Sequence, residues 1–176
     1  MSRKSWDQHF LNIALEVANM GTCARRQVGC VLVDQHKVIL ATGFNGVPSK
    51  FEHCRDNPGH ECQGANLPSG TGLDFCQAIH AEQNALLHCQ DVRRVHAVYC
   101  TSSPCTTCVK LILGTQATRI VFVERYPHDT SEGLWTRNHL EERDRAGTLV
   151  RSWYRTWEQL QPDGSVKVIG SSEWRK

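Results

Sequence analysis

The chain has 176 residues, which is enough for one domain with a single sizeable core and too few for two domains of ordinary size. Hydrophobic residues make up 40% and charged residues 22%, a composition that predicts a globular chain and excludes a disordered one. The formal net charge of +2 is too small to indicate a nucleic-acid-binding surface.

The chain shows no signal for export or membrane insertion. No apolar run reaches the length of a membrane span, and the N-terminal residues lack the apolar stretch of a signal peptide. We therefore expect a protein of a reducing cytoplasm, the host cytoplasm if the protein is viral, with neither a membrane nor a nucleic acid as partner.

The first half of the chain predicts a helix, a hairpin and a long loop. Apolar residues recur at helical spacing over residues 5–20, and Gly21 is a natural stop. The β-branched runs at 28–33 and 38–41 predict a hairpin. Residues 42–71 are rich in Gly, Pro, Asn and Ser, and an irregular segment of this length is functional or is held by something other than a core, such as a metal.

The second half alternates strands with helices, which predicts an α/β fold. Helices are expected over 79–89, 105–113 and 134–146, and strands over 95–100, 120–123 and 148–154. We place one domain at residues 1–158 and a polar C-terminal tail, with a Pro-Asp-Gly turn, at 159–176.

Nine cysteines are many for a chain of this length, and a reducing compartment argues against a disulfide framework. Cys30, Cys89 and Cys100 lie in or beside apolar runs and are predicted to be small core residues. The other six lie in polar or turn-rich sequence, where metal binding is the better explanation.

Two short motifs carry metal-site chemistry. His80-Ala-Glu82 opens one predicted helix, and Pro104-Cys105-Thr-Thr-Cys108 opens the next. Each motif alone is weak, since the cysteines also fit a redox pair or half of a zinc ribbon, and the histidine also fits a helix cap. In this order, each at a helix start, they resemble the signature of zinc-dependent nucleobase deaminases.

The residue types suit that chemistry. Catalytic zinc takes nitrogen and sulfur ligands and leaves one position open for water, so His80, Cys105 and Cys108 supply three ligands. Helix N-termini favour the thiolate form of the cysteines. Glu82 is two positions from His80 and can transfer protons without binding the metal. The expected reaction is attack on C4 of a cytosine ring with loss of ammonia.

A wider resemblance is to the deoxycytidylate (dCMP) deaminases of the cytidine deaminase superfamily. It covers roughly residues 6–128 and rests on the stretches 23–29, 42–46, 67–70, 76–85 and 99–108. The resemblance implies a three-layer α/β/α sandwich with a central mixed five-stranded sheet. It also implies hydrolysis of dCMP to dUMP and ammonia, which feeds dTMP synthesis.

The resemblance also implies roles for residues around the substrate. Asn45 is expected to contact the sugar, the backbone around Ser102 and Ser103 to contact the base, and Tyr126 to line the pocket. Ala81 is also expected to bind the substrate. A 5′-phosphate needs a cationic partner, for which the candidates are Arg25, Arg26 and Arg125.

Many members of this family are hexamers that dCTP activates and dTTP inhibits. The resemblance therefore implies an allosteric homo-oligomer, with dCTP or dTTP, and Mg²⁺, bound near Gly43 and Gly46.

The remaining cysteines predict a second, structural zinc. Cys23, Cys54, Cys62 and Cys76 resemble one branch of the family at these positions, and they could pin the irregular segment. His53 and His60 are alternative ligands. We therefore expect two zinc ions per chain.

Two other functions remain open at this point. One is deamination of a different cytosine compound, such as a modified dCMP, dCTP or a base in RNA. The other is a non-catalytic zinc module that binds nucleic acid, against which stand the small net charge and Glu82, because a structural site has no use for an acid beside the metal.

Overall fold

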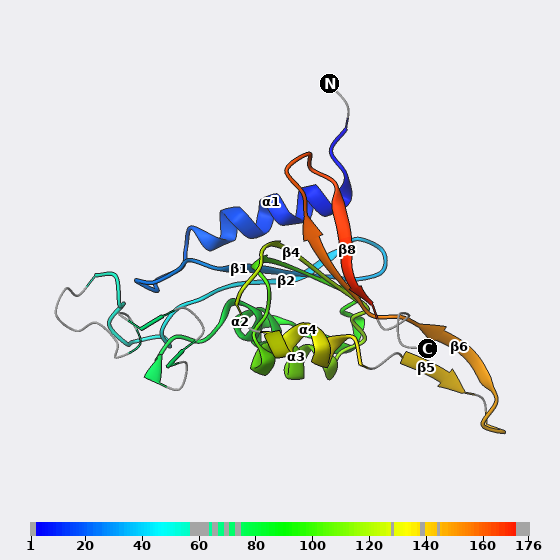
Figure 1. The fold of residues 1–176 in the computed structure, drawn as a ribbon. Helices are drawn as coiled ribbons and strands as arrows, with labels where there is room; N and C mark the ends of the chain where they lie inside the picture. The colour runs from blue at the N-terminus through cyan, green and yellow to red at the C-terminus, as the bar shows by residue number, and fades with distance from the viewer. Residues whose placement is uncertain are drawn as a thin grey trace.

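A mixed β-sheet runs through the centre of the computed structural model (Figure 1). The structure describes residues 3–56, 64, 67–68, 71–72, 75–127, 129–137, 140–143 and 145–171. The strands of this sheet are β1 (Gly29–Val33), β2 (Ile39–Phe44), β3 (Ala97–Ser102), β4 (Arg119–Glu124), β7 (Thr156–Leu160) and β8 (Val166–Ser171). They lie in the order β2-β1-β3-β4-β7-β8, with β3, β4 and β7 parallel and the other neighbours antiparallel.

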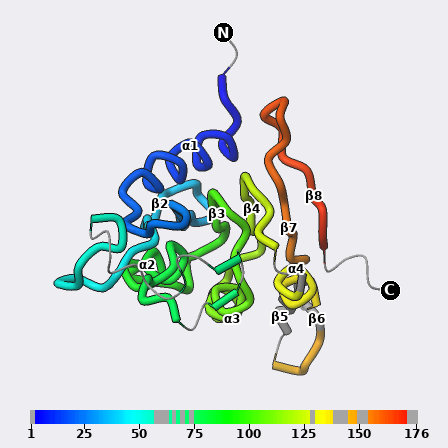
Figure 2. The backbone as a smooth tube through the Cα atoms, turned by 60° about the vertical axis from the view of Figure 1, so that its left-hand side comes forward, coloured from blue at the N-terminus to red at the C-terminus, as the bar shows by residue number. Residues whose placement is uncertain are grey.

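Helices cover both faces of the sheet, which confirms the predicted three-layer α/β/α sandwich (Figures 1 and 2). One face carries α1 (Trp6–Ala18), and the other carries α2 (Ala81–His88), α3 (Thr106–Leu113) and α4 (Asp129–Trp135). None of the helices in the described ranges has both the length and the apolar character needed to cross a lipid bilayer.

The core consists of two apolar layers, because neighbouring strand residues point to opposite faces. Val31 and Val33 pack under α1, whereas Cys30 and Leu32 pack under α2 and α3. Cys30 and Cys100 are opposite each other in the β1–β3 register and are fully buried. The prediction of core thiols at these two positions is therefore confirmed.

The sheet has six strands, not the expected five, because the chain after residue 158 continues into it. The predicted boundary at 158/159 falls inside β7, and β8 follows a turn in which Gly164 has φ +82°. The Oδ1 of Asp163 accepts hydrogen bonds from the backbone and the hydroxyl of Ser165. Since β8 is an edge strand, it tolerates polar residues, and this composition made it resemble a tail.

The helix expected over 134–146 is wrong. Helix α4 ends at Trp135, and the chain then forms β5 (Leu140–Arg143) and β6 (Leu149–Trp153), a separate two-stranded sheet that extends away from the three layers (Figure 1). The charged sequence between residues 141 and 145 offers no apolar stripe for a helix to bury. Gly147, at φ +82°, lies in the turn between these two strands.

Candidate active site

His80 is fixed at the start of α2. It is the N-cap residue of that helix, and its backbone N–H donates to Oε1 of Gln83 over 2.8 Å, as in a capping box. The helix packs closely on β2, because a Cβ at Gly43 would lie 2.3 Å from the backbone nitrogen of Ala85. The position of the imidazole is therefore set by a helix cap and by backbone packing.

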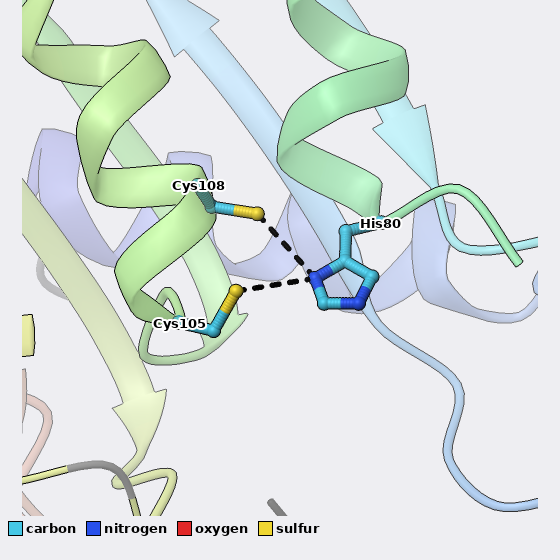
Figure 3. A group of neighbouring side chains, drawn as sticks. All are labelled: His80, Cys105 and Cys108. Atoms are coloured by element: carbon cyan, nitrogen blue, oxygen red, sulfur yellow. Dashed lines mark hydrogen bonds between the residues drawn. The ribbon is translucent and has the colours of Figure 1, made fainter. Parts of the chain in front are cut away.

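Cys105 and Cys108 occupy the equivalent place on α3. Cys105 is the N-cap residue, and Cys108 lies three positions further on, so both sulfurs are on one side of the first turn. Both side chains are buried. Nδ1 of His80 lies 3.5 Å from Sγ of Cys105 and 3.4 Å from Sγ of Cys108 (Figure 3).

These three residues fit a zinc ion. A tetrahedral zinc with bonds of about 2.1 Å to nitrogen and about 2.3 Å to sulfur separates its nitrogen and sulfur ligands by about 3.6 Å. The observed separations of 3.4 and 3.5 Å are close to this value. Within the described part of the chain, these residues are also the one group of three or more ligating side chains with all ligand atoms within 4.8 Å of one another.

The electrostatics of the two thiols also calls for a cation. Hydrogen bonds from Cys108 and His80 lower the pKa of the Cys105 thiol to about 3. The same contact with Cys105, together with burial, raises the pKa of Cys108 well above its usual range. The negative charge of the Cys105 thiolate therefore disfavours ionisation of the Cys108 thiol. A divalent cation bound between the two sulfurs would allow both thiols to be deprotonated.

Glu82 lies beside this cluster without being part of it. It is in the first turn of α2, only 4% exposed, and it lines the same cavity as His80 and Cys105. Burial raises the pKa of its carboxyl group, whereas the nearby His80 acts in the opposite direction. A buried carboxyl group next to a metal site and facing a cavity is suited to accept and return a proton.

The cavity in front of the cluster has a volume of about 300 Å³, and it brings the expected substrate residues together. Asn45, Ala81, Ser102, Ser103, Tyr126, Arg25 and Arg26 all line it. They lie at or just after the carboxyl ends of β2, β3 and β4, at the start of α2 and in the loop before β1. Their contacts with a substrate stay predictions.

Several of these side chains are already held by hydrogen bonds. Oδ1 of Asn45 accepts from the backbone of Val28 at 2.8 Å, and its Nδ2 donates to the carbonyl of Arg26 at 2.7 Å. Oγ of Ser103 accepts from the backbone N–H of Tyr126 at 2.8 Å. The walls of the cavity are thus preorganised.

The three candidate arginines differ in their surroundings. Arg25 donates to the carbonyls of Leu67 and Pro68, both at 2.9 Å, so it holds a loop that forms part of the cavity wall. Arg26 donates to Oγ of Ser102 at 3.0 Å and lies 5.8 Å from the ring centroid of Tyr126.

Arg125 faces a different partner. It pairs with Glu132 at 3.0 Å and is not among the residues that line the cavity. Arg25 and Arg26 thus both line the cavity, and Arg25 also supports its wall. Arg26 lies 3.9 Å from Oε2 of Glu124, and its contact with an anionic group of a ligand stays a prediction.

The residues of the predicted second zinc are only partly described. Cys23 and Cys54 are each 8% exposed, Cys76 is half-buried, and Cys23 and Cys76 line the cavity. Cys62 and His60 lie outside the described residues. The His53 ring is 3.0 Å from Oδ2 of Asp56, which gives it a partner other than a metal.

The effector positions Gly43 and Gly46 have packing roles. A Cβ at Gly46 would lie 2.5 Å from Oγ1 of Thr22, and Gly43 contacts α2 as described above. Their expected contact with an effector stays a prediction.

Sequence reasoning missed some residues of the site. Leu67 and Val28 line the cavity, and Gln83 caps the helix that carries His80. Gln83 could have been found, because a polar cap followed three positions later by Gln is the spacing of a capping box.

A helix-capping histidine, two cysteines on the next helix and a buried glutamate beside them are the set of side chains that a catalytic zinc site uses. Comparison with known protein families also indicates a zinc site in this part of the chain. The family described as "Cytidine and deoxycytidylate deaminase zinc-binding region" matches residues 4–124. The chain belongs to this family.

Individual relatives give the same result. The chain is 37% identical over 160 residues to the deoxycytidylate deaminase of Saccharomyces cerevisiae, covering 90% of this chain and 48% of that one. It is 38% identical over 127 residues to the deoxycytidylate deaminase of Mycobacterium phage D29, covering 69% of this chain and 97% of that one. The chain thus spans about half the length of the yeast relative.

The fold also matches a solved structure. The apo structure of dCMP deaminase from the cyanophage S-TIM5 is 25% identical, with a TM-score of 0.55, and the match covers 76% of this chain and 94% of that chain. The expected sandwich is therefore supported by an independent fold comparison.

Proposed function

We propose that this protein hydrolyses dCMP to dUMP and ammonia in a zinc-dependent reaction and so feeds dTMP synthesis. The observation that carries the proposal is the cluster of His80, Cys105 and Cys108, with Glu82 beside it, at the base of a cavity of about 300 Å³. Membership of the deaminase family supports it, and the cyanophage enzyme has also been solved in complex with dCMP and dUMP.

The chain's own residues have distinct tasks in this reaction. A zinc ion held by the cluster would supply Lewis-acid activation of water at neutral pH. Glu82 takes a proton from the attacking water and delivers it to the ring nitrogen. It then carries the proton of the new C4 hydroxyl group to the leaving amine, so that C4 becomes a carbonyl carbon and ammonia departs. Asn45, Ser102 and Ser103, which the local hydrogen bonds hold in place, orient the nucleotide.

Other cytosine nucleotides, such as a modified dCMP or dCTP, are the alternative substrates. Competition kinetics among dCMP, CMP, dCTP and deoxycytidine separate them. We expect the highest kcat/KM for dCMP, and a preference for the unphosphorylated nucleoside would contradict the proposal.

Arg26 is proposed to bind the 5′-phosphate. Arg26→Gln is expected to raise the KM for dCMP about tenfold or more, because a charge-assisted hydrogen bond is lost, and to change kcat/KM for deoxycytidine little. The measurement is steady-state kinetics on both substrates.

Arg125→Gln is the matched control, since Arg125 pairs with Glu132 and does not line the cavity. It should leave both substrates unaffected. An equal loss on dCMP and deoxycytidine in Arg26→Gln would instead assign Arg26 a structural role through Ser102 and Tyr126.

A second, structural zinc held by Cys23, Cys54, Cys62 and Cys76 is also proposed. Its support is that Cys23 and Cys54 are buried in polar sequence, and that a Cβ at Gly64, two positions after Cys62, would lie 3.8 Å from Cβ of Cys76. Metal analysis should give two zinc ions per chain for the wild type and one for Cys54→Ser. One zinc in the wild type, with normal folding of Cys54→Ser, would refute the second site.

Regulation by dCTP or dTTP with Mg²⁺, assembly as a hexamer and a cytoplasmic location stay predictions from the resemblance.

One surface feature is consistent with the assembly of several chains. Leu87 and Leu111 are 72% and 47% exposed and line the same hollow beside α2 and α3. An apolar surface of this kind is typical of a contact between protein chains.

A further inference from the structure

A second hollow lies at the opposite end of β3 from the candidate active site. It has a volume of about 480 Å³ and is formed by the turn after β1, the segment that leads into β3 and the segment that leads into β4. Since β3 has six residues, about 20 Å of strand separates this hollow from the cluster end of the sheet. It therefore forms no part of the dCMP cavity.

Asp34 lines this hollow, and both oxygens of its carboxylate accept hydrogen bonds. Its side chain is 3% exposed. Oδ1 accepts the backbone N–H groups of His36 and Val38 at 2.8 and 2.9 Å, and Oδ2 accepts from Nη2 of Arg94 at 2.7 Å. The hydrogen bonds from Val38 and His36 and the pairing with Arg94 hold the pKa of Asp34 below its usual range, although burial opposes them. Asp34 is therefore negatively charged, and this charge is paired with the Arg94 guanidinium.

Apart from Asp34 and Val95, the side chains that line the hollow are cationic or able to donate hydrogen bonds. Arg93, Arg94 and His36 are exposed in the hollow, and His96 lines it deeper down. In the part of the chain that the structure describes, no carboxylate pairs with the Arg93 guanidinium, and the nearby Asp91 accepts only the backbone N–H of that residue. The hollow is therefore lined by two arginines and by one buried carboxylate, which Arg94 already pairs with.

We propose that this hollow binds the phosphate groups of a diphosphate or triphosphate. Guanidinium groups match phosphate oxygens in a fork geometry, and the imidazole and amide donors around them add further hydrogen bonds. The two arginines lie on the segment before β3, and His36 lies on the turn after β1, so the donors converge from two sides. The volume of about 480 Å³ is that of a small-molecule site and exceeds what a single phosphate needs.

The test is isothermal titration of the zinc-loaded protein with inorganic triphosphate, in the presence of dUMP to fill the catalytic cavity. A parallel titration with ATP distinguishes a nucleotide from free polyphosphate as the source of the phosphates. Arg93→Gln is expected to weaken triphosphate binding about tenfold or more, because a charge-assisted contact is lost. Turnover of dCMP by this variant should remain at the wild-type level, which shows that the fold is intact.

The matched control is Arg145→Gln, which removes an exposed arginine from the β5–β6 turn and should leave triphosphate binding unchanged. Three results would overturn the proposal. They are the absence of triphosphate binding by the wild type, binding that Arg93→Gln does not weaken, and binding that Arg26→Gln weakens instead. The last would place the anion in the catalytic cavity.

Discussion

Replacing Glu82 with glutamine should lower kcat for dCMP deamination by roughly two to four orders of magnitude, which corresponds to about 3 to 5 kcal/mol of transition-state stabilisation. The amide has the size of the carboxyl group, so the 4% exposed site is not emptied. It cannot accept a proton from water and pass it on. Steady-state release of ammonia from dCMP measures the effect.

The zinc content of Glu82→Gln should equal that of the wild type, because Glu82 lies outside the group of ligating side chains. Glu16→Gln on α1 is the matched control and should retain full activity. If Glu82→Gln were as active as the wild type, the proposed proton transfer would be refuted. If the variant lost its zinc, Glu82 would have to be reassigned as a ligand.

Cys108→Ser is expected to remove the catalytic zinc and to reduce turnover to the uncatalysed background. Serine is a poor zinc ligand, and Cys108 is fully buried beside His80, so the substitution removes one of the three ligands of the cluster. Loss of the bound ion also removes its contribution to stability, about 3 kcal/mol at zinc concentrations of about 100 times Kd. Metal analysis, activity and Tm measure the three effects together.

Cys89→Ser provides the comparison for Cys108→Ser. Cys89 is half-buried, lies directly after α2 and packs against the core rather than against the cluster. Its replacement should leave the zinc content and kcat unchanged. Full zinc content and turnover in Cys108→Ser would show that the metal is bound elsewhere.

The sequence predicted those parts of the fold whose pattern is local. The helices that carry His80 and Cys105 begin where the motifs place them, because a capping residue and the residues after it specify a helix start. The hairpin of β1 and β2 follows from two β-branched runs around a turn. The metal cluster was predictable for the same reason, since each motif brings its own helix start.

The parts that failed depend on tertiary context. β8 is a short run between polar segments, and its pairing with β7 holds it in the sheet, so the composition of residues 159–176 resembled a tail. The choice between Arg25 and Arg26 rests on the carbonyls of Leu67 and Pro68, which lie more than 40 positions away in the chain. No spacing rule connects residues over such a separation.

The central claim is that a zinc ion held by His80, Cys105 and Cys108 converts a cytosine nucleotide with the help of Glu82. The most direct measurement follows dCMP consumption by ultraviolet absorbance while ammonia is quantified in the same sample, before chelation, after chelation and after zinc is restored. We expect equimolar dUMP and ammonia from the zinc-loaded protein, none after chelation, and recovery with zinc. Undiminished turnover by the chelated protein, once metal analysis shows it to be free of zinc, or no turnover by the zinc-loaded protein, would contradict the account.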